Sequence, residues 1–186
     1  MEILREYITS ILESSSILVP PPPPIKERLK ELAYIQSQRL SPFNEEELQE
    51  SLDNDISGLF NYVTEKYEGK NCLDYLSELK KKIEPVILHH KVYFNSPRPS
   101  QLAAAHRIPF DYDKLNSAQT PSYPSGHAAQ AYYIAEKLSE VFPNSSGKFF
   151  LVAEMIAQSR IDRGVHFPSD INSGKILAEK MLSIDL

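Results

Sequence analysis

The placement of proline restricts the fold of this chain more than any other feature of its sequence. Five of the 14 prolines stand in one run at Pro20–Pro24, and five more are spread over residues 97–124. Proline has a fixed φ and no N–H, so a long helix cannot pass through either segment. We expect the run to form an extended polyproline II spacer packed on the body of the protein, with a ligand for a proline-binding domain as the alternative. Residues 97–124 should form a long irregular connection, and such connections often carry function.

The remaining segments repeat their apolar residues at helical spacing. The predicted helices cover residues 2–14, 25–39, 45–66, 72–90, 126–141, 147–162 and 168–183, with Asn44 as the N-cap of the third. The sequence has no sustained period-two alternation and no internal repeat. The pattern therefore predicts an all-α fold, a single-domain helical bundle.

Charge and composition narrow the choice of partners. The net charge is −5, and nucleic-acid binding through phosphates needs a basic surface, so no nucleic-acid partner is expected. Cys72 is the only cysteine, which excludes an internal disulfide and favours a reducing compartment. The N-terminus mixes charged residues into its apolar positions, unlike a signal peptide, and no segment has the apolar length of a membrane span. We therefore expect a cytoplasmic protein without a membrane span.

Three short groups of polar residues stand out in the C-terminal half. They are Lys91-x6-Arg98-Pro99, Pro124-Ser125-Gly126-His127 and Ser159-Arg160-x5-His166-x3-Asp170. Taken singly, each has an ordinary explanation, such as a solvated cation, a helix N-cap or an acidic residue in the first turn of a helix. A lone histidine is likewise more often a surface or core residue than a catalyst.

Taken together, the groups fit the recognition of a phosphate. Lys91, Arg98 and Arg160 supply three cations on an otherwise acidic protein, and arginine has the planar geometry that suits an oxyanion. The N–H groups around Ser125 and Gly126 open a predicted helix, and helix N-termini bind anions. We therefore expect an anion site at one end of the bundle, formed by loops and helix N-termini.

The two histidines of these groups lie on different elements, so one can attack phosphorus while the other protonates the leaving oxygen. His166 lies in the turn between two predicted helices, and Asp170 lies one turn into the second of them. Asp170 can therefore hold the Nδ1–H of an imidazole and leave its Nε2 free as a nucleophile. Tyr132 and Tyr133, which follow the second group, are expected in the core.

The three groups, complete and in order, resemble the signature of the type 2 phosphatidic acid phosphatase (PAP2) superfamily. This superfamily also contains the bacterial class A non-specific acid phosphatases and the vanadium haloperoxidases. The stretch from Leu18 through the proline run to Arg39 resembles the N-terminal part of mature class A acid phosphatases, which are expected to be the closest relatives. The resemblance assigns residues 18–186 to one domain with its signature at 91–170, and leaves the predicted helix within residues 1–17 outside it.

The resemblance implies a role for each signature residue. His166 would be the nucleophile that forms a phosphohistidine, Asp170 would orient it, and His127 would be the general acid that later activates water. The phosphoryl oxygens would be held by Lys91, Arg98, Ser125, Gly126 and Arg160. No cofactor is expected, because three cations and a helix end supply the positive charge that phosphoryl transfer requires. The implied activity is a metal-independent acid phosphatase acting on phosphate monoesters of small molecules.

Two other functions remain open from the sequence. A vanadate-dependent haloperoxidase would hold vanadate in the same pocket, and a catalytically inactive protein would only bind phosphate. The carboxylate pairs Asp53/Asp55 and Asp111/Asp113 could bind Mg²⁺ in another context, but neither follows an apolar strand, so no metal site is predicted. The sequence is also compatible with a homo-oligomer.

Overall fold

The computed structural model of the protein describes residues 17–39 and 46–184, and every regular element within these ranges is a helix. The α-helices are α2 (Ile25–Gln38), α3 (Glu46–Asn54), α4 (Ile56–Glu68), α5 (Leu73–Phe94), α6 (Pro99–Ala105), α7 (Gly126–Val141), α8 (Ser146–Asp162) and α9 (Pro168–Ser183). Short 3₁₀ helices lie at Asn116–Ala118 and Pro143–Ser145. The predicted all-α fold is confirmed, whereas the predicted helix 2–14 and the cap Asn44 lie outside the described residues.

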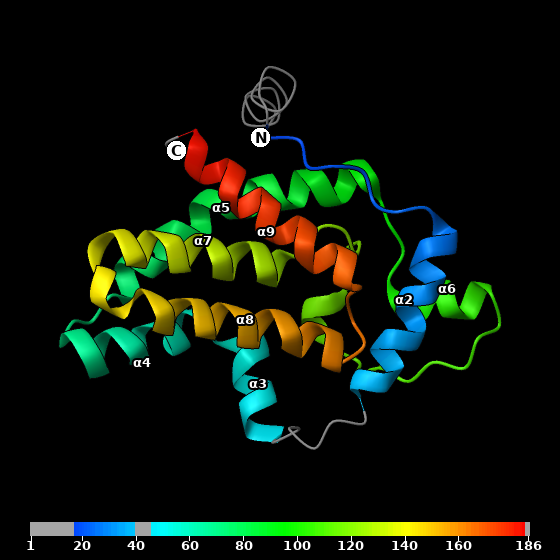
Figure 1. The fold of residues 1–186 in the computed structure, drawn as a ribbon, viewed down its shortest axis with the longest axis horizontal. Helices are drawn as coiled ribbons and strands as arrows, with labels where there is room; N and C mark the ends of the chain where they lie inside the picture. Colours follow the sequence, from blue (N-terminus) through cyan, green and yellow to red (C-terminus); the bar gives the residue numbers. More distant parts are fainter. Residues whose placement is uncertain (1–16, 40–45, 185–186) are drawn as a thin grey trace.

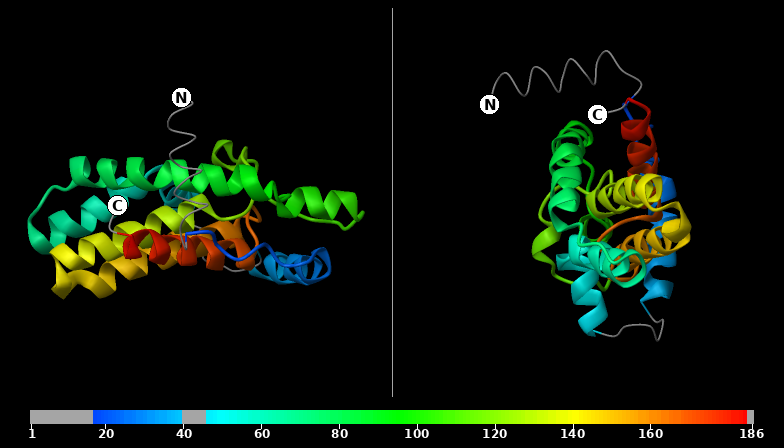
Figure 2. Two further views of the ribbon diagram at one scale, coloured as in Figure 1. Left: turned by 90° about the horizontal axis from the view of Figure 1, so that it is seen from above. Right: turned by 90° about the vertical axis from the view of Figure 1, so that its left-hand side faces the viewer.

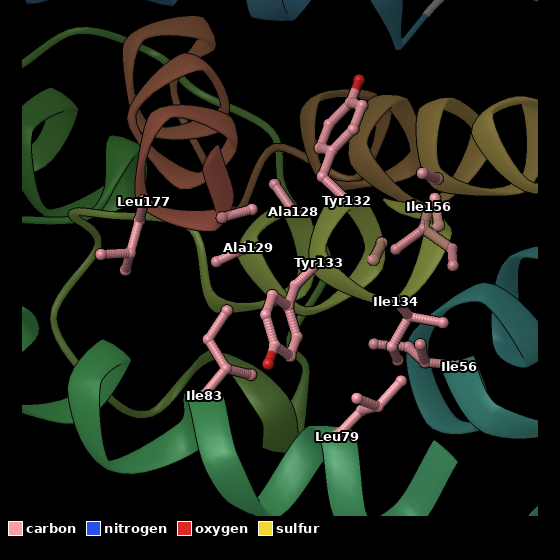
Figure 3. Packing of buried hydrophobic residues seen from close by; sticks show 14 of the residues in the cluster. Ile56, Leu79, Ile83, Ala128, Ala129, Tyr132, Tyr133, Ile134, Ile156 and Leu177 are labelled. Atoms are coloured by element: carbon pink, nitrogen blue, oxygen red, sulfur yellow. The ribbon is translucent and has the colours of Figure 1, made fainter. Parts of the chain in front are cut away.

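Helix α7 forms the centre of the bundle and packs against α5, α8 and α9 (Figure 1). Its first turns carry Ala128 and Ala129, both fully buried, and small side chains allow neighbouring helices to approach closely. Tyr132 and Tyr133 are 9% and 0% exposed, as predicted for core residues. Around α7, Figure 3 shows Leu79, Ile83, Ile156 and Leu177 contributed by its neighbours.

Four helix ends meet at one end of this bundle. Helices α7 and α9 begin there, and α5 and α8 end there (Figure 1). The N–H of Ser125 donates to the carbonyl oxygen of Asp170 at 3.0 Å, which joins the start of α7 to the first turn of α9. All three sequence groups are therefore brought to the same end of the molecule.

The proline run leads the chain along the bundle to this end. Val19 is buried, and the hydroxyl of Tyr123 donates to the carbonyl oxygen of Pro20 at 2.5 Å. Pro24 has φ −54° and ψ 150°, the polyproline II conformation, and α2 begins directly after it. Helix α2 then lies beside α6 and α8, next to the end where the four helix termini meet (Figure 2). The run is thus attached to the body at its start and ends in the polyproline II conformation, which agrees with the spacer interpretation, while Pro20, Pro21 and Pro24 are exposed.

The single helix predicted over residues 45–66 is wrong. The chain breaks at Asp55, where φ is −131° and ψ is 56°, and the Asp55 carboxylate accepts the N–H of Gly58 at 2.8 Å as the N-cap of α4. Aspartate favours such capping positions over the interior of a helix. Helices α3 and α4 therefore run in different directions (Figure 1), and Asp53 lies buried in the last turn of α3.

Two smaller differences affect the site. The connection predicted as irregular contains α6, which begins at Pro99, a position where proline is tolerated because the first N–H of a helix has no intrahelical partner. Helix α5 continues through Pro85 to Phe94, beyond the predicted end at residue 90. Lys91 consequently lies in the last turn of α5.

The close crossing of α9 and α7 gives a prediction for stability. A Cβ at Gly174 would lie 2.7 Å from the Ser125 carbonyl oxygen and 3.0 Å from the Ala129 nitrogen. We expect Gly174→Ala to lower the free energy of unfolding by roughly 1–3 kcal/mol, the usual cost of overpacking, although alanine favours the helix itself. Urea unfolding measures this change.

The matched control is Gly147→Ala, because a Cβ there meets nothing within 4 Å. This variant should be neutral or more stable, since alanine exceeds glycine in helix propensity by about 1 kcal/mol. Equal stability of the two variants would contradict the close crossing.

Candidate active site

A pocket of about 200 Å³ opens where the four helix ends meet. Its walls include five predicted site residues, namely Lys91, Arg98, Gly126, His127 and His166. The other three, Ser125, Arg160 and Asp170, are fully buried beside these walls. The structure thus brings the eight predicted site residues together, and both histidines face one pocket.

His166 is held in one tautomer by its neighbours. Its Nδ1 lies 3.1 Å from Oδ2 of Asp170, which also accepts the backbone N–H of Phe167 at 3.0 Å and the hydroxyl of Ser122. An oxygen that receives donors from the protein on several sides acts as an acceptor, so Nδ1 of His166 carries the proton. The Nε2 lone pair then accepts a hydrogen bond from Nη1 of Arg98 at 3.1 Å.

The imidazole of His166 is neutral in this setting. Burial, followed by the positive charges of Arg98 and Lys91, lowers the pKa of His166 well below its usual value. A neutral imidazole with an unprotonated Nε2 is the form that can act as a nucleophile.

Lys91 and Arg98 give the pocket its positive wall. The ammonium of Lys91 donates to the carbonyl oxygen of Pro121 at 2.5 Å, and Arg98 donates to the carbonyl oxygens of Thr120 and Val165 at 3.0 and 2.8 Å. Burial, together with the charge of Arg98, lowers the pKa of Lys91 to about 7. Burial likewise lowers the pKa of Arg98 to about 10, so its guanidinium is charged at neutral pH.

Arg160 is completely buried and rests on a carboxylate that the sequence groups do not contain. Its Nη1 lies 2.5 Å from Oδ1 of Asp53, and its Nη2 donates to Oγ of Ser117 at 3.0 Å. Burial alone would raise the pKa of Asp53, but the Ser117 hydrogen bond and the Arg160 charge outweigh it and hold that pKa below its usual value. Removing one partner of such a buried pair typically costs about 3–5 kcal/mol.

Asp53 also contacts the second histidine. Nε2 of His127 lies 2.9 Å from the backbone oxygen of Asp53 and 3.5 Å from its Oδ1. A carbonyl oxygen only accepts, so Nε2 carries a proton and Nδ1 is the nitrogen left for a ligand. Burial and the charge of Arg160 lower the pKa of His127 to about 3, so the ring is neutral.

The start of α7 differs in detail from the sequence expectation. Ser125 is the N-cap of α7, and its hydroxyl oxygen accepts the N–H of Ala128 at 3.4 Å. The backbone N–H of Ser125 donates to the carbonyl oxygen of Asp170. Gly126 allows α7 to approach α5, because a Cβ there would lie 3.3 Å from the Ile87 side chain. The roles of Ser125 and Gly126 in binding phosphate stay predictions.

The carboxylate pairs considered for metal binding are used differently. Asp53 forms an ion pair with Arg160, and Asp55 caps α4. The carboxylate of Asp113 forms ion pairs with Arg39 and Arg163, both at 2.9 Å. Within residues 17–39 and 46–184, no three His, Cys, Asp or Glu side chains gather in a way that could hold a metal ion. A second cavity of about 610 Å³ adjoins Asp53 and these ion pairs, and its lining includes none of the eight predicted site residues.

Comparison with known proteins shows a family match and two similar curated proteins. The PAP2 superfamily matches residues 82–183. A non-specific acid phosphatase from Providencia stuartii is 38% identical over 68 residues, which cover 37% of this chain and 27% of that protein. An acid phosphatase from Zymomonas mobilis is 32% identical over 66 residues, which cover 36% of this chain and 25% of that protein. The chain thus spans about a quarter of the length of these curated relatives.

Since the superfamily match covers more than half of the 186 residues, the chain belongs to the PAP2 superfamily. A solved structure shares the fold: the transmembrane PAP2 type phosphatidylglycerolphosphate phosphatase from Bacillus subtilis aligns with a TM-score of 0.53 and 18% identity, over 86% of this chain and 84% of that chain. In the part of this chain that the structure describes, no helix has the length and apolar character needed to cross a membrane.

The lowered pKa of Lys91 predicts a pH dependence of anion binding. Below about pH 7 the Lys91 side chain is a charged ammonium. Above that value Lys91 must take up a proton before it can hold an anion, so the affinity for the anion should fall with rising pH. Sulfate suits the test, because its charge does not change over this range. We expect the sulfate dissociation constant, measured by calorimetry, to increase between pH 7 and pH 9.

Lys91→Met is the control for this titration. The variant should bind sulfate more weakly at pH 6 and should lose most of the pH dependence. A wild-type affinity that stays constant from pH 6 to pH 9 would refute the assignment to Lys91.

Proposed function

We propose that the protein is a phosphatase that hydrolyses phosphate monoesters through a phosphohistidine on His166, without a metal. The observation that carries this proposal is the balance of buried charge. Among the described residues, four buried cations (Arg28, Lys91, Arg98 and Arg160) face two buried carboxylates (Asp53 and Asp170). With Lys91 protonated, the excess is two positive charges, which complements the charge of a phosphoryl dianion.

In the first step, Nε2 of His166 attacks phosphorus and the bond to the leaving oxygen breaks. Arg98 lies 3.1 Å from that nitrogen, so a phosphoryl oxygen held by its guanidinium is placed next to the nucleophile. Asp170 accepts the Nδ1–H and stabilises the positive charge that grows on the ring. The cations stabilise the phosphoryl oxygens in the transition state.

The leaving oxygen takes a proton from His127. The pKa of this histidine is about 3, and a bound dianion opposes the effect of Arg160 and favours the imidazolium. Nδ1 therefore takes up a proton from solvent when the substrate binds. Nδ1 then donates to the leaving oxygen, because Nε2 is held by the Asp53 carbonyl.

In the second step, the now neutral His127 removes a proton from water, and the oxygen of that water attacks phosphorus. The bond between phosphorus and His166 breaks, and inorganic phosphate leaves. The names of the two acid phosphatase relatives support this reaction class, and the substrate is expected to be a small phosphate monoester.

Hydrolysis in the presence of EDTA tests the proposal and the role of His127 together. Wild-type protein should hydrolyse p-nitrophenyl phosphate and glycerol phosphate with undiminished rates in EDTA. His127→Ala should lower kcat/KM for glycerol phosphate by roughly 10²–10⁴-fold, the range for general acid catalysis. The ratio kcat/KM is the right measure because it covers only the steps up to release of the leaving group, whereas kcat also contains the second step, in which His127 acts as the base. The loss should be much smaller for p-nitrophenyl phosphate, because nitrophenolate leaves without a proton.

His106→Ala is the control, since His106 is an exposed histidine that does not line the pocket. Equal losses of kcat/KM for both substrates in His127→Ala would remove the general-acid role, and loss of wild-type activity in EDTA would refute metal independence. Bromination of an indicator dye with vanadate and peroxide, without hydrolysis, would instead identify a haloperoxidase. Phosphate binding without either reaction would identify an inactive binding protein.

A further inference from the structure

Arg28 on α2 is a buried cation that none of the three sequence groups contains. Its side chain is 3% exposed, its Nη2 donates to Oδ1 of Asp170 at 2.9 Å, and its Nη1 donates to Oγ of Ser96. Its guanidinium carbon lies 3.9 Å from the centre of the Phe167 ring. Burying an arginine is costly unless it is paired, so these contacts define one position for the side chain.

The two carboxylate oxygens of Asp170 have different hydrogen-bond partners. Oδ2 receives Nδ1–H of His166, the N–H of Phe167 and the hydroxyl of Ser122, while Oδ1 receives Arg28. With both oxygens bound, the carboxylate cannot rotate away from His166 without breaking a charge-assisted hydrogen bond.

The contact with Ser96 extends this support to the first sequence group. Ser96 lies two residues before Arg98, and its carbonyl oxygen accepts the N–H of Ser122 at 2.9 Å. Arg28 therefore joins the start of α9 to the segment that carries Arg98. The residue lies outside the part of the chain that matches the superfamily, and α2 brings it to the site.

We propose that Arg28 is a positioning residue, which acts through Asp170 on the orientation and charge of His166 and through Ser96 on the segment of Arg98. The proposal rests on the proposed function of His166 as the nucleophile.

The electrostatic surroundings of Asp170 make the proposal measurable. The charged and titratable groups that act on it are Arg28 and Glu31 from α2, Lys91 from α5, Arg98 before α6, Tyr123 and His166. Burial raises the pKa of Asp170, and the charge of Arg28 is the largest influence that opposes this rise. Without Arg28 the pKa rises further, so the carboxylate takes up a proton at a higher pH and no longer stabilises charge on His166.

The test compares Arg28→Met, Arg28→Lys and Arg39→Met over a range of pH. Arg39 also lies on the α2 segment and is ion-paired, at 3.1 Å to Asp111 and 2.9 Å to Asp113, so its variant measures a general loosening of α2. In Arg28→Met, kcat should fall about 10–100-fold, the range seen when partners that orient metal-binding histidines are removed, while KM changes little. This loss of kcat relative to wild type should be largest at acidic pH and should become smaller as the pH rises.

Arg28→Lys should recover part of the activity, because an ammonium can reach Asp170 but cannot also fork to Ser96. Arg39→Met should keep the wild-type pH profile. A deficit of the same size at every pH, or the same deficit in Arg39→Met, would reduce Arg28 to a structural role and overturn the proposal.

A second readout does not depend on turnover. The Nδ1 proton of His166, hydrogen-bonded to a carboxylate, should give a strongly downfield proton resonance that is absent from Asp170→Asn. In the Arg28 variants this resonance should be lost at a higher pH than in wild type, and an unchanged titration would overturn the proposal.

If wild type hydrolyses no phosphate ester, the proposed function fails, and this resonance still decides whether Arg28 positions Asp170. If Arg28→Met does not fold, Arg28→Lys carries both measurements.

Discussion

The burial of positive charge at one end of a helical bundle is the constraint on which the site depends. Lys91, Arg98 and Arg160 would each be more stable in water, and burial lowers the pKa of all three. The positive charge comes from these side chains and not from the helix ends, because the N-termini of α7 and α9 meet the C-termini of α5 and α8 there. Such a region is stable only with carboxylates beside it, and it still favours a further anion. The proposed affinity for a phosphoryl group rests on this excess of buried positive charge.

The N-terminal third of the described chain supplies the groups that this arrangement needs. Asp53 on α3 balances Arg160 and holds His127 through its backbone oxygen. Arg28 on α2 balances Asp170, which in turn holds His166. Each residue connects two of the three sequence groups or the elements that carry them. Helices α2 and α3 thus fix the relative positions of residues that lie far apart in the sequence.

The gathering of the eight predicted site residues at one place could be predicted from sequence because their types and spacing match one chemistry, whereas their roles stay predictions. The sequence points to Asp53 only as half of a carboxylate pair with little promise as a metal site. Spacing alone does not reveal that Asp55 ends one helix and caps the next, which is what places Asp53 beside Arg160. Arg28 did leave a signal: it shares the buried face of α2 with Leu32 and Ile35, at the spacing i, i+4, i+7. An arginine on an apolar face needs a buried partner, but the sequence does not say that the partner is Asp170. The long-range pairs of the site depend on tertiary packing, which local patterns do not encode.

The most direct test of the central claim is to map the phosphorylated residue during turnover. Protein mixed with ³²P-labelled substrate and quenched in alkali should carry a label that acid releases, as expected for a phosphoramidate bond. Peptide mapping should place that label on His166. Turnover with the label on another residue, or with no labelled protein at any time before steady state, would contradict the account.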